Sequence, residues 1–158
     1  ADLTWALLLA VARRVAEGDA YVRSGDWSGW APTQMLGTDV SGKTLGIVGM
    51  GRIGSAVAQR ARAFGLSIAY HNRHRLPEPV EQVLGAKWYA DLDALLAESD
   101  IVSVNCPLNA ETRGMIDARR IGLMASEAYF INTSRGEIAN YVLKKLAAYG
   151  KAIGYLST

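Results

Sequence analysis

Hydrophobic and polar positions change along the chain in short blocks, each about the length of one strand or one helix. Short apolar runs predict buried strands at 44–48, 67–70, 87–89, 101–105, 129–132 and 152–156. Stretches with helical spacing between them predict helices at 52–64, 80–84, 91–97, 117–124 and 141–149. Strands that alternate with helices indicate an α/β fold, in which helices cover both faces of a parallel sheet.

The first part of the chain has a different pattern. Apolar side chains recur every four residues at Leu3, Leu7, Val11 and Val15. This spacing predicts one amphipathic helix over 2–17, with Asp2 as its cap and Gly18 as its stop. The following loop at 24–32 is polar except for Trp27, Trp30 and their neighbours. Exposed aromatic residues often cover another chain; the alternative is that both tryptophans fold back on their own core.

Composition limits the class of protein. The 158 residues are 50% hydrophobic, enough for the core of one ordinary domain, and the formal net charge of +2 is too small to indicate nucleic-acid binding. Cys106 is the only cysteine, which fits a reducing cytoplasm. The apolar run at 3–12 is too short to span a bilayer, and its flanking charges are in the wrong order for a signal peptide. We expect a soluble intracellular protein without bound metal.

The sequence Gly49-Met50-Gly51-Arg52-Ile53-Gly54 follows the predicted strand 44–48 and opens the next helix. Glycine-rich hexamers arise by chance, but a strand before and a helix after give this one a mechanism. Gly49 allows a tight turn, Gly51 lets the backbone approach a pyrophosphate, and Gly54 lets helix and strand pack closely. The free N–H groups of the helix start then face the phosphates. We therefore predict a Rossmann-type doubly wound sheet that binds a dinucleotide through residues 49–54.

The end of the second strand bears on the choice of cofactor. NAD-binding domains carry an acidic residue about twenty positions after the glycines, which bonds the ribose 2′-hydroxyl. Asn72 stands at that place, followed by Arg73, His74 and Arg75. The arginines can pair with a 2′-phosphate, although arginines in a loop are often only solvated. The sequence favours NADP(H) over NAD(H), and His74, like His71, is expected to be solvated or to contact the 2′ group.

Four segments occur in an informative order: 46–54, Asn105-Cys106-Pro107-Leu108, Glu111-Thr112 with Met115-Ile116, and Ile131-Asn132-Thr133-Ser134-Arg135-Gly136. Together they resemble the cofactor domain of the D-2-hydroxyacid dehydrogenases, especially the glyoxylate and hydroxypyruvate reductase branch. Residues 1–9 and the Trp27–Trp30 segment look like the N-terminal helix and arm of that branch. In that family this region packs against the partner subunit, so we expect a homodimer.

The resemblance also implies roles for individual residues. Arg135 would hold the carboxylate and carbonyl of a 2-keto acid, a task that suits a planar guanidinium. Asn105, Cys106 and Pro107 would line the ribose and adenine side of the cofactor, with Thr112, Thr133 and Ser134 as further cofactor contacts. Cys106 is then a small packing residue rather than a nucleophile.

Some parts of the family pattern are missing from this sequence. The glutamate and histidine that complete catalysis lie beyond its last residue, and Ser157 stands where an aspartate would hold the nicotinamide amide. We expect a helix and arm at 1–38, a Rossmann core at 39–158 and no substrate domain. Three hypotheses remain: an incomplete dehydrogenase cofactor domain, an NADP(H)-binding module or engineered domain without chemistry, and an assembly role in which the cofactor is incidental.

Overall fold

The computed structural model describes residues 1–139 and 153–155. Its strands are all parallel: β1 (Thr44–Val48), β2 (Ser67–His71), β3 (Ala86–Trp88), β4 (Ile101–Val104), β5 (Tyr129–Asn132) and β6 (Ile153–Tyr155). They form one sheet in the order β3-β2-β1-β4-β5-β6. This is the doubly wound Rossmann order, in which the chain reverses its direction of travel between β1 and β4. The predicted fold class is confirmed.

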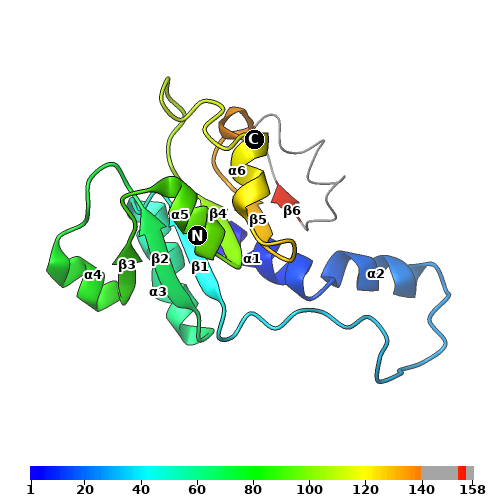
Figure 1. The fold of residues 1–158 in the computed structure, drawn as a ribbon. Helices are drawn as coiled ribbons and strands as arrows, with labels where there is room; N and C mark the ends of the chain where they lie inside the picture. Colours follow the sequence, from blue (N-terminus) through cyan, green and yellow to red (C-terminus); the bar gives the residue numbers. More distant parts are fainter. Residues whose placement is uncertain (140–152, 156–158) are drawn as a thin grey trace.

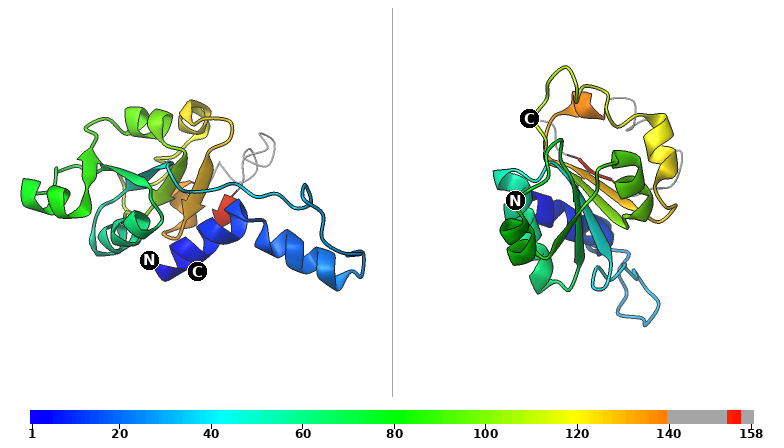
Figure 2. Two further views of the ribbon diagram at one scale, coloured as in Figure 1. Left: turned by 90° about the horizontal axis from the view of Figure 1, so that it is seen from below. Right: turned by 60° about the vertical axis from the view of Figure 1, so that its left-hand side comes forward.

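Helices cover both faces of the sheet (Figures 1 and 2). They are α1 (Asp2–Ala12), α2 (Val15–Arg23), α3 (Arg52–Ala63), α4 (Glu78–Leu84), α5 (Leu92–Glu98) and α6 (Ala118–Leu123), with a 3-10 turn η1 (Gly136–Ile138) after β5. Residues of α1, α3 and α4 share one core cluster, and residues of α5 and α6 share a second. Helices α1, α3 and α4 therefore pack on one face of the sheet, and α5 and α6 pack on the other.

The strands β1, β2, β4 and β5 each contribute side chains to both clusters. Within β1, Ile47 belongs to the cluster under α1 and α3, whereas its neighbour Val48 belongs to the cluster under α5. Ile101 and Val102 of β4 divide in the same way. Successive side chains of a strand point to opposite faces, so a strand buried on both faces reads as an unbroken apolar run. This is why the sequence predicts these strands well.

The single helix predicted over 2–17 is wrong. α1 ends at Ala12, and Arg14 adopts a left-handed backbone with φ of 54°. The Ala12 carbonyl, which a continuous helix would use internally, accepts a hydrogen bond from the N–H of Thr38 at 2.7 Å. Gly37 passes so close that a Cβ there would lie 2.6 Å from the Ala12 oxygen. The returning chain thus ends the helix, and no local signal in residues 2–17 reveals it.

The predicted cap and stop of that helix are also wrong. Asp2 is the first residue of α1 rather than its cap, and it forms an ion pair with Arg60 of α3 at 2.8 Å. Gly18 lies inside α2 instead of ending a helix. The sheet side of α1 presents Trp5, Leu8 and Ala12 to the core, and Trp5 stacks on Phe64 at a centroid distance of 4.5 Å.

The N-terminal arm extends away from the sheet (Figure 1). The side chains of Trp27 and Trp30 are 53% and 82% exposed, so the alternative that they fold back on the core is wrong. Two residues of the predicted apolar stripe, Leu3 and Val15, are exposed as well. Apolar surface on α1, α2 and the arm is therefore exposed in the single chain.

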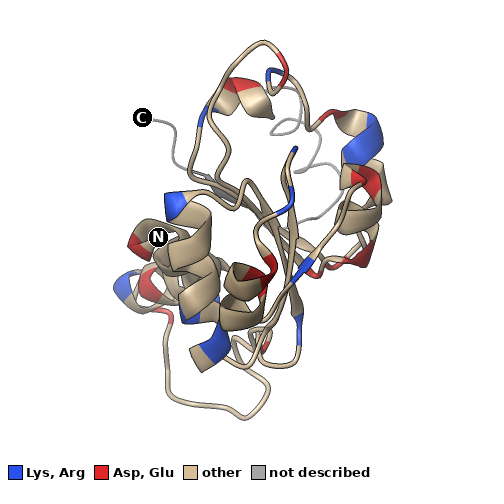
Figure 3. Cartoon of the chain, turned by 90° about the vertical axis from the view of Figure 1, so that its left-hand side faces the viewer, with Lys and Arg blue, Asp and Glu red and all other residues tan. Residues whose placement is uncertain are grey.

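The other predicted elements agree with the structure to within two residues at each end. The helix predicted at 141–149 and Ser157 lie outside the described residues. In Figure 3 basic and acidic residues are interspersed along the helices and loops, as the small net charge suggests. Across 1–139 and 153–155, no helix has the length and apolar character needed to cross a membrane. The same residues contain no cluster of three or more His, Cys, Asp or Glu side chains that could hold a metal.

Candidate functional site

A cavity of about 380 Å³ lies at the carboxyl edge of the sheet. Its lining includes Val48 at the end of β1, His71 at the end of β2 and Asn105 directly after β4. β1 and β4 flank the point where the strand order reverses, and β2 lies next to β1. In open α/β sheets this switch point is the usual ligand site, because the loops after neighbouring strands diverge there and leave a crevice.

The glycine turn between β1 and α3 forms the floor of this cavity. Gly49 has φ of 97°, and a Cβ there would lie 2.6 Å from the backbone nitrogen of Cys106. A Cβ on Gly54 would lie 2.2 Å from the Gly49 carbonyl oxygen, so α3 starts directly against the turn. Gly51, by contrast, has no described atom within 4 Å of its Cβ position, and no side chain of the described residues caps the start of α3. The turn thus presents open backbone and uncapped N–H groups, which suits a pyrophosphate.

The loop after β4 contributes a polar atom that has no partner. Asn105 donates from Nδ2 to the carbonyl and hydroxyl oxygens of Ser103, at 3.3 and 3.0 Å. Its Oδ1 is the buried side-chain polar atom that lacks a hydrogen-bond partner among the described residues. Because an unpaired buried acceptor costs free energy, this oxygen is suited to receive a ligand donor. With the open space at Gly51, it shows that the residues present fit a dinucleotide.

Cys106 follows in the same loop and is partly buried. Burial raises the pKa of its thiol, which disfavours the thiolate that nucleophilic chemistry needs. The Cys106 carbonyl accepts a hydrogen bond from the hydroxyl of Ser134, which joins the loops after β4 and β5. These contacts support Cys106 as a packing residue of the cavity wall.

Asn72 reaches across to the glycine turn. Its Oδ1 accepts a hydrogen bond from the N–H of Met50 at 2.7 Å, and its carbonyl oxygen lies 3.4 Å from the indole nitrogen of Trp88. Next to it, Nδ1 of His71 lies 3.0 Å from the carbonyl oxygen of Tyr89. The end of β2 is thereby tied both to the turn and to the chain after β3.

Arg75 is not among the residues that line the cavity. Its guanidinium makes a two-pronged ion pair with Glu81 of α4, with a shortest distance of 2.7 Å, and lies 5.8 Å from the ring centroid of Trp88. The carboxylate of Glu81 also accepts from the hydroxyl of Tyr70 at 2.6 Å. Burial, followed by this contact, raises the pKa of Tyr70 to about 12. The Tyr70 hydroxyl in turn accepts a hydrogen bond from the N–H of Leu76 at 2.8 Å. These contacts anchor the end of the loop that leads from β2 to α4.

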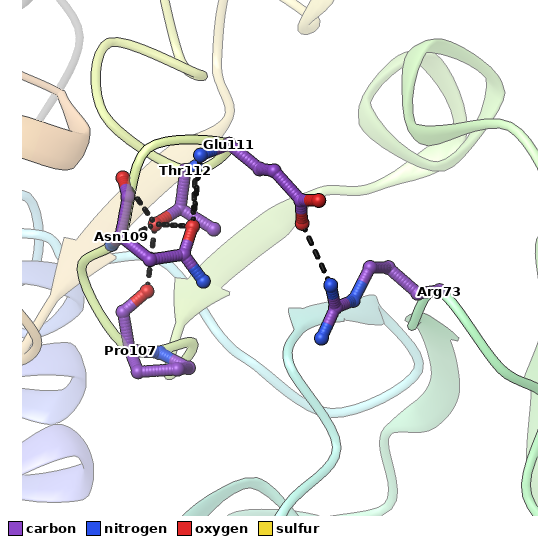
Figure 4. A network of polar contacts seen from close by, with 5 residues as sticks. All are labelled: Arg73, Pro107, Asn109, Glu111 and Thr112. Atoms are coloured by element: carbon purple, nitrogen blue, oxygen red, sulfur yellow. Dashed lines mark hydrogen bonds and ion pairs between the residues drawn. The ribbon is translucent and has the colours of Figure 1, made fainter.

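Arg73 lies at the rim of the cavity instead. Its Nη1 is 2.8 Å from Oε2 of Glu111, and the two side chains are 72% and 65% exposed. Glu111 belongs to the loop after β4, so the ion pair joins two loops that line the same cavity (Figure 4). Of the two predicted 2′-phosphate partners, the structure thus brings one to the cavity and not the other.

Arg135 follows β5 and is exposed. Asn132, which is 1% exposed, shapes its turn: Oδ1 accepts from the N–H of Ser134 at 2.9 Å and Nδ2 donates to the Arg135 carbonyl at 3.1 Å. The hydroxyls of Thr133 and Thr4 are 3.1 Å apart, which ties this turn to α1. The buried amide therefore fixes the backbone from which the guanidinium projects.

The structure brings together at one cavity the predicted residues 49–51, 72–74, 105–107 and 112. It does not bring Arg52, Ile53, Arg75 or the 133–135 turn to the cavity lining, and Gly54 acts through the packing of α3. Sequence reasoning missed four lining residues, Val48, Asn109, Glu111 and Met115. The signal for Asn109 and Glu111 is the Asn-x-x-Thr spacing of 109–112, which is typical of a side-chain-stabilised turn.

This fold and site define a Rossmann-type dinucleotide-binding domain. Residues 5–149 match the family described as "D-isomer specific 2-hydroxyacid dehydrogenase, NAD binding domain". The match spans most of the chain, so the chain belongs to this family, as its motifs suggested.

Similar proteins agree with this assignment. The chain is 51% identical over 152 residues to a glyoxylate reductase of Thermococcus litoralis, covering 92% of this chain and 45% of the relative. A solved glyoxylate reductase from Paecilomyes thermophila superposes with a TM-score of 0.85 at 40% identity, covering 97% and 46% of the two chains. An acyclic imino acid reductase solved with NADPH and D-Arg gives 0.78 at 32% identity, covering 92% and 44%. The chain thus spans less than half the length of these relatives.

Proposed function

We propose that the cavity binds a nicotinamide dinucleotide, with the pyrophosphate against the turn at 49–54. The observation that carries this proposal is the open backbone of Gly51 at the switch point of the sheet. Gly49 and Gly54 are tightly packed by comparison, so the turn leaves room at one position where a phosphate needs to approach. Asn105, whose buried Oδ1 has no hydrogen-bond partner among the described residues, lies in the lining of the same cavity.

NADP(H) is the preferred form of the cofactor in this proposal. The amide of Asn72 replaces the carboxylate that would repel a 2′-phosphate, and it is occupied with Met50. Arg73 lies at the rim and can donate to the phosphate, whereas Arg75 is committed to Glu81. A similar structure, the acyclic imino acid reductase, contains NADPH. Because Arg75 is paired with Glu81, the proposed preference for NADP(H) depends on Arg73 alone rather than on both arginines.

In the complete enzyme we propose reduction of a small 2-keto acid such as glyoxylate or hydroxypyruvate. A nicotinamide held in the cavity would supply hydride chemistry, and Arg135 would orient the substrate carboxylate through two parallel N–H donors. His71 is the last residue of β2 and His74 lies just after it. Because β1 and β4 separate β2 from β5, neither histidine is placed to protonate a substrate held by Arg135. We propose that residues 1–158 bind the cofactor but do not turn over substrate. In this proposal residues 1–38 form the N-terminal helix and arm, and residues 39–158 form the Rossmann core.

The exposed apolar surface of the arm supports a homodimer. Trp27 and Trp30, together with Val22 and Leu36, expose more than half of their side chains. Large exposed aromatic residues are enriched at the centres of protein interfaces. We also place the protein in the reducing cytoplasm on the basis of its single free thiol, Cys106.

Fluorescence titration with NADPH and NADH tests the binding proposal. We expect saturable binding of both cofactors, with NADPH bound about ten- to a hundredfold more tightly. This ratio corresponds to the free energy of one charge-assisted hydrogen bond. Arg73→Ala should remove that preference, and Arg75→Ala should leave most of it. Oxidation of NADPH in the presence of glyoxylate should not exceed the background rate. Binding of neither cofactor would refute the proposal, and turnover abolished by Arg135→Ala would refute the absence of a proton donor.

A further inference from the structure

The ion pair between Arg73 and Glu111 lies at the rim of the cavity, outside the hydrophobic core. Both side chains are mostly exposed, and both belong to loops that line the cavity (Figure 4). Exposed ion pairs of this kind contribute little to stability, because water and salt screen them. Their position therefore matters more for a ligand at the rim than for folding.

The backbone that carries Glu111 is held firmly. Oδ1 of Asn109 accepts the N–H groups of Glu111 and Thr112, at 2.9 and 3.0 Å. The Thr112 hydroxyl donates to the carbonyl of Pro107 at 2.7 Å and accepts the N–H of Asn109 at 2.8 Å. This self-bonded turn fixes the backbone from which the Glu111 side chain reaches Arg73.

A carboxylate in this place has opposite effects on the two cofactors. A 2′-phosphate carries close to two negative charges, so it would compete with the Glu111 carboxylate for the guanidinium of Arg73 and would be held close to a like charge. A 2′-hydroxyl carries no charge and leaves the ion pair intact, and the carboxylate can accept its proton in a hydrogen bond. Glu111 therefore opposes NADPH and is neutral or favourable to NADH.

On the basis of the proposed function, we propose that Glu111 is a specificity-determining residue that limits the preference for the 2′-phosphorylated cofactor by competing for Arg73. The charge of Arg73 favours NADPH, and the opposing charge of Glu111 offsets part of that gain. The balance between them leaves the site able to bind both cofactors, with a smaller preference for NADPH than Arg73 alone would give.

The test compares Glu111→Gln with a matched charge change at Glu127. Glu127 is exposed and precedes β5, so it lies at the amino edge of the sheet, opposite the cavity. Dissociation constants for NADPH and NADH are measured by titration calorimetry for wild type, Glu111→Gln, Glu127→Gln, Arg73→Ala and the Arg73→Ala/Glu111→Gln double variant. Each is measured at low and at high salt, because screening should shrink a charge effect.

We expect Glu111→Gln to bind NADPH about two- to fivefold more tightly, as the free energy of an exposed charge contact implies, and NADH no more tightly than wild type. Glu127→Gln should match wild type, and the gain should vanish in the Arg73→Ala background and shrink at high salt. Equal changes for both cofactors, or weaker NADPH binding, would overturn the inference while leaving cofactor binding itself intact. Failure of wild type to bind either cofactor would overturn the proposed function and this inference with it.

Discussion

One substitution, glycine to alanine, is expected to have opposite consequences at two positions of the turn before α3. At Gly54 the new Cβ would lie 2.2 Å from the Gly49 carbonyl oxygen and 3.2 Å from Cγ2 of Ile47. Overpacking of this kind costs about 1–3 kcal/mol, and the better helix propensity of alanine recovers up to about 1 kcal/mol. The free energy of unfolding should fall by about 1–2 kcal/mol, which lowers Tm by about 2–8 °C.

At Gly51 the same methyl group meets nothing within 4 Å, and φ of −83° is accessible to alanine. Stability should change by less than about 0.5 kcal/mol. Bound pyrophosphate, however, would be pushed off the backbone and lose a hydrogen bond to a charged group, worth about 1.5–3 kcal/mol. Affinity for NADPH and NADH should therefore fall about ten- to a hundredfold.

Urea unfolding and cofactor titration of the two variants, measured beside wild type, separate these effects. Gly54→Ala should shift the unfolding midpoint, whereas Gly51→Ala should keep the midpoint and lose the binding. A Gly51→Ala variant that folds normally and binds both cofactors as tightly as wild type would refute the claim that this backbone faces the pyrophosphate.

Three further outcomes follow from other parts of the structure. Trp27→Ala/Trp30→Ala should shift the proposed dimer toward monomer in sedimentation at tens of micromolar (roughly the range where a standard-size interface holds), and a wild-type monomer there would contradict the dimer. Hydrogen bonds from Arg119 and Arg120 lower the pKa of Asp93 to about 2, below its unfolded value near 3.9, so its stabilisation is complete above about pH 4 and lost as pH falls toward 2. Asp93→Asn should flatten that acid-side slope in thermal melts, and an unchanged slope would count against the ion pairs. Asn132→Ala leaves polar groups of the 133–135 turn unpaired and should cost about 1–3 kcal/mol in urea unfolding; a smaller loss would mean that water replaces the amide.

The sequence predicts those features that depend on local pattern. Strands such as Ile101–Val104 are buried on both faces, so their apolar runs are unambiguous. The turn at 49–54 is recognisable because glycine is required there for reasons of space and φ. Asp91 and Asp117 each cap the helix that follows, within a residue of the predicted starts.

What the sequence could not predict depends on distant contacts. The end of α1 is set by Thr38, which returns from beyond the arm. Arg73 pairs with Glu111 of the loop after β4, whereas Arg75 pairs with Glu81 of α4, so distant residues decide where each guanidinium lies. Nothing in the local sequence distinguishes the two arginines, so both were equally good candidates for the 2′ group.

The central claim is that a nicotinamide dinucleotide binds at the carboxyl edge of β1, β2 and β4. Backbone amide NMR of this 17.0 kDa chain during an NADPH titration tests it most directly. We predict that the perturbed amides cluster at 49–54, 72–74 and 105–112, with those of α2 unaffected. Shifts confined to α1, α2 and the arm, or no shifts at saturating NADPH, would contradict the claim.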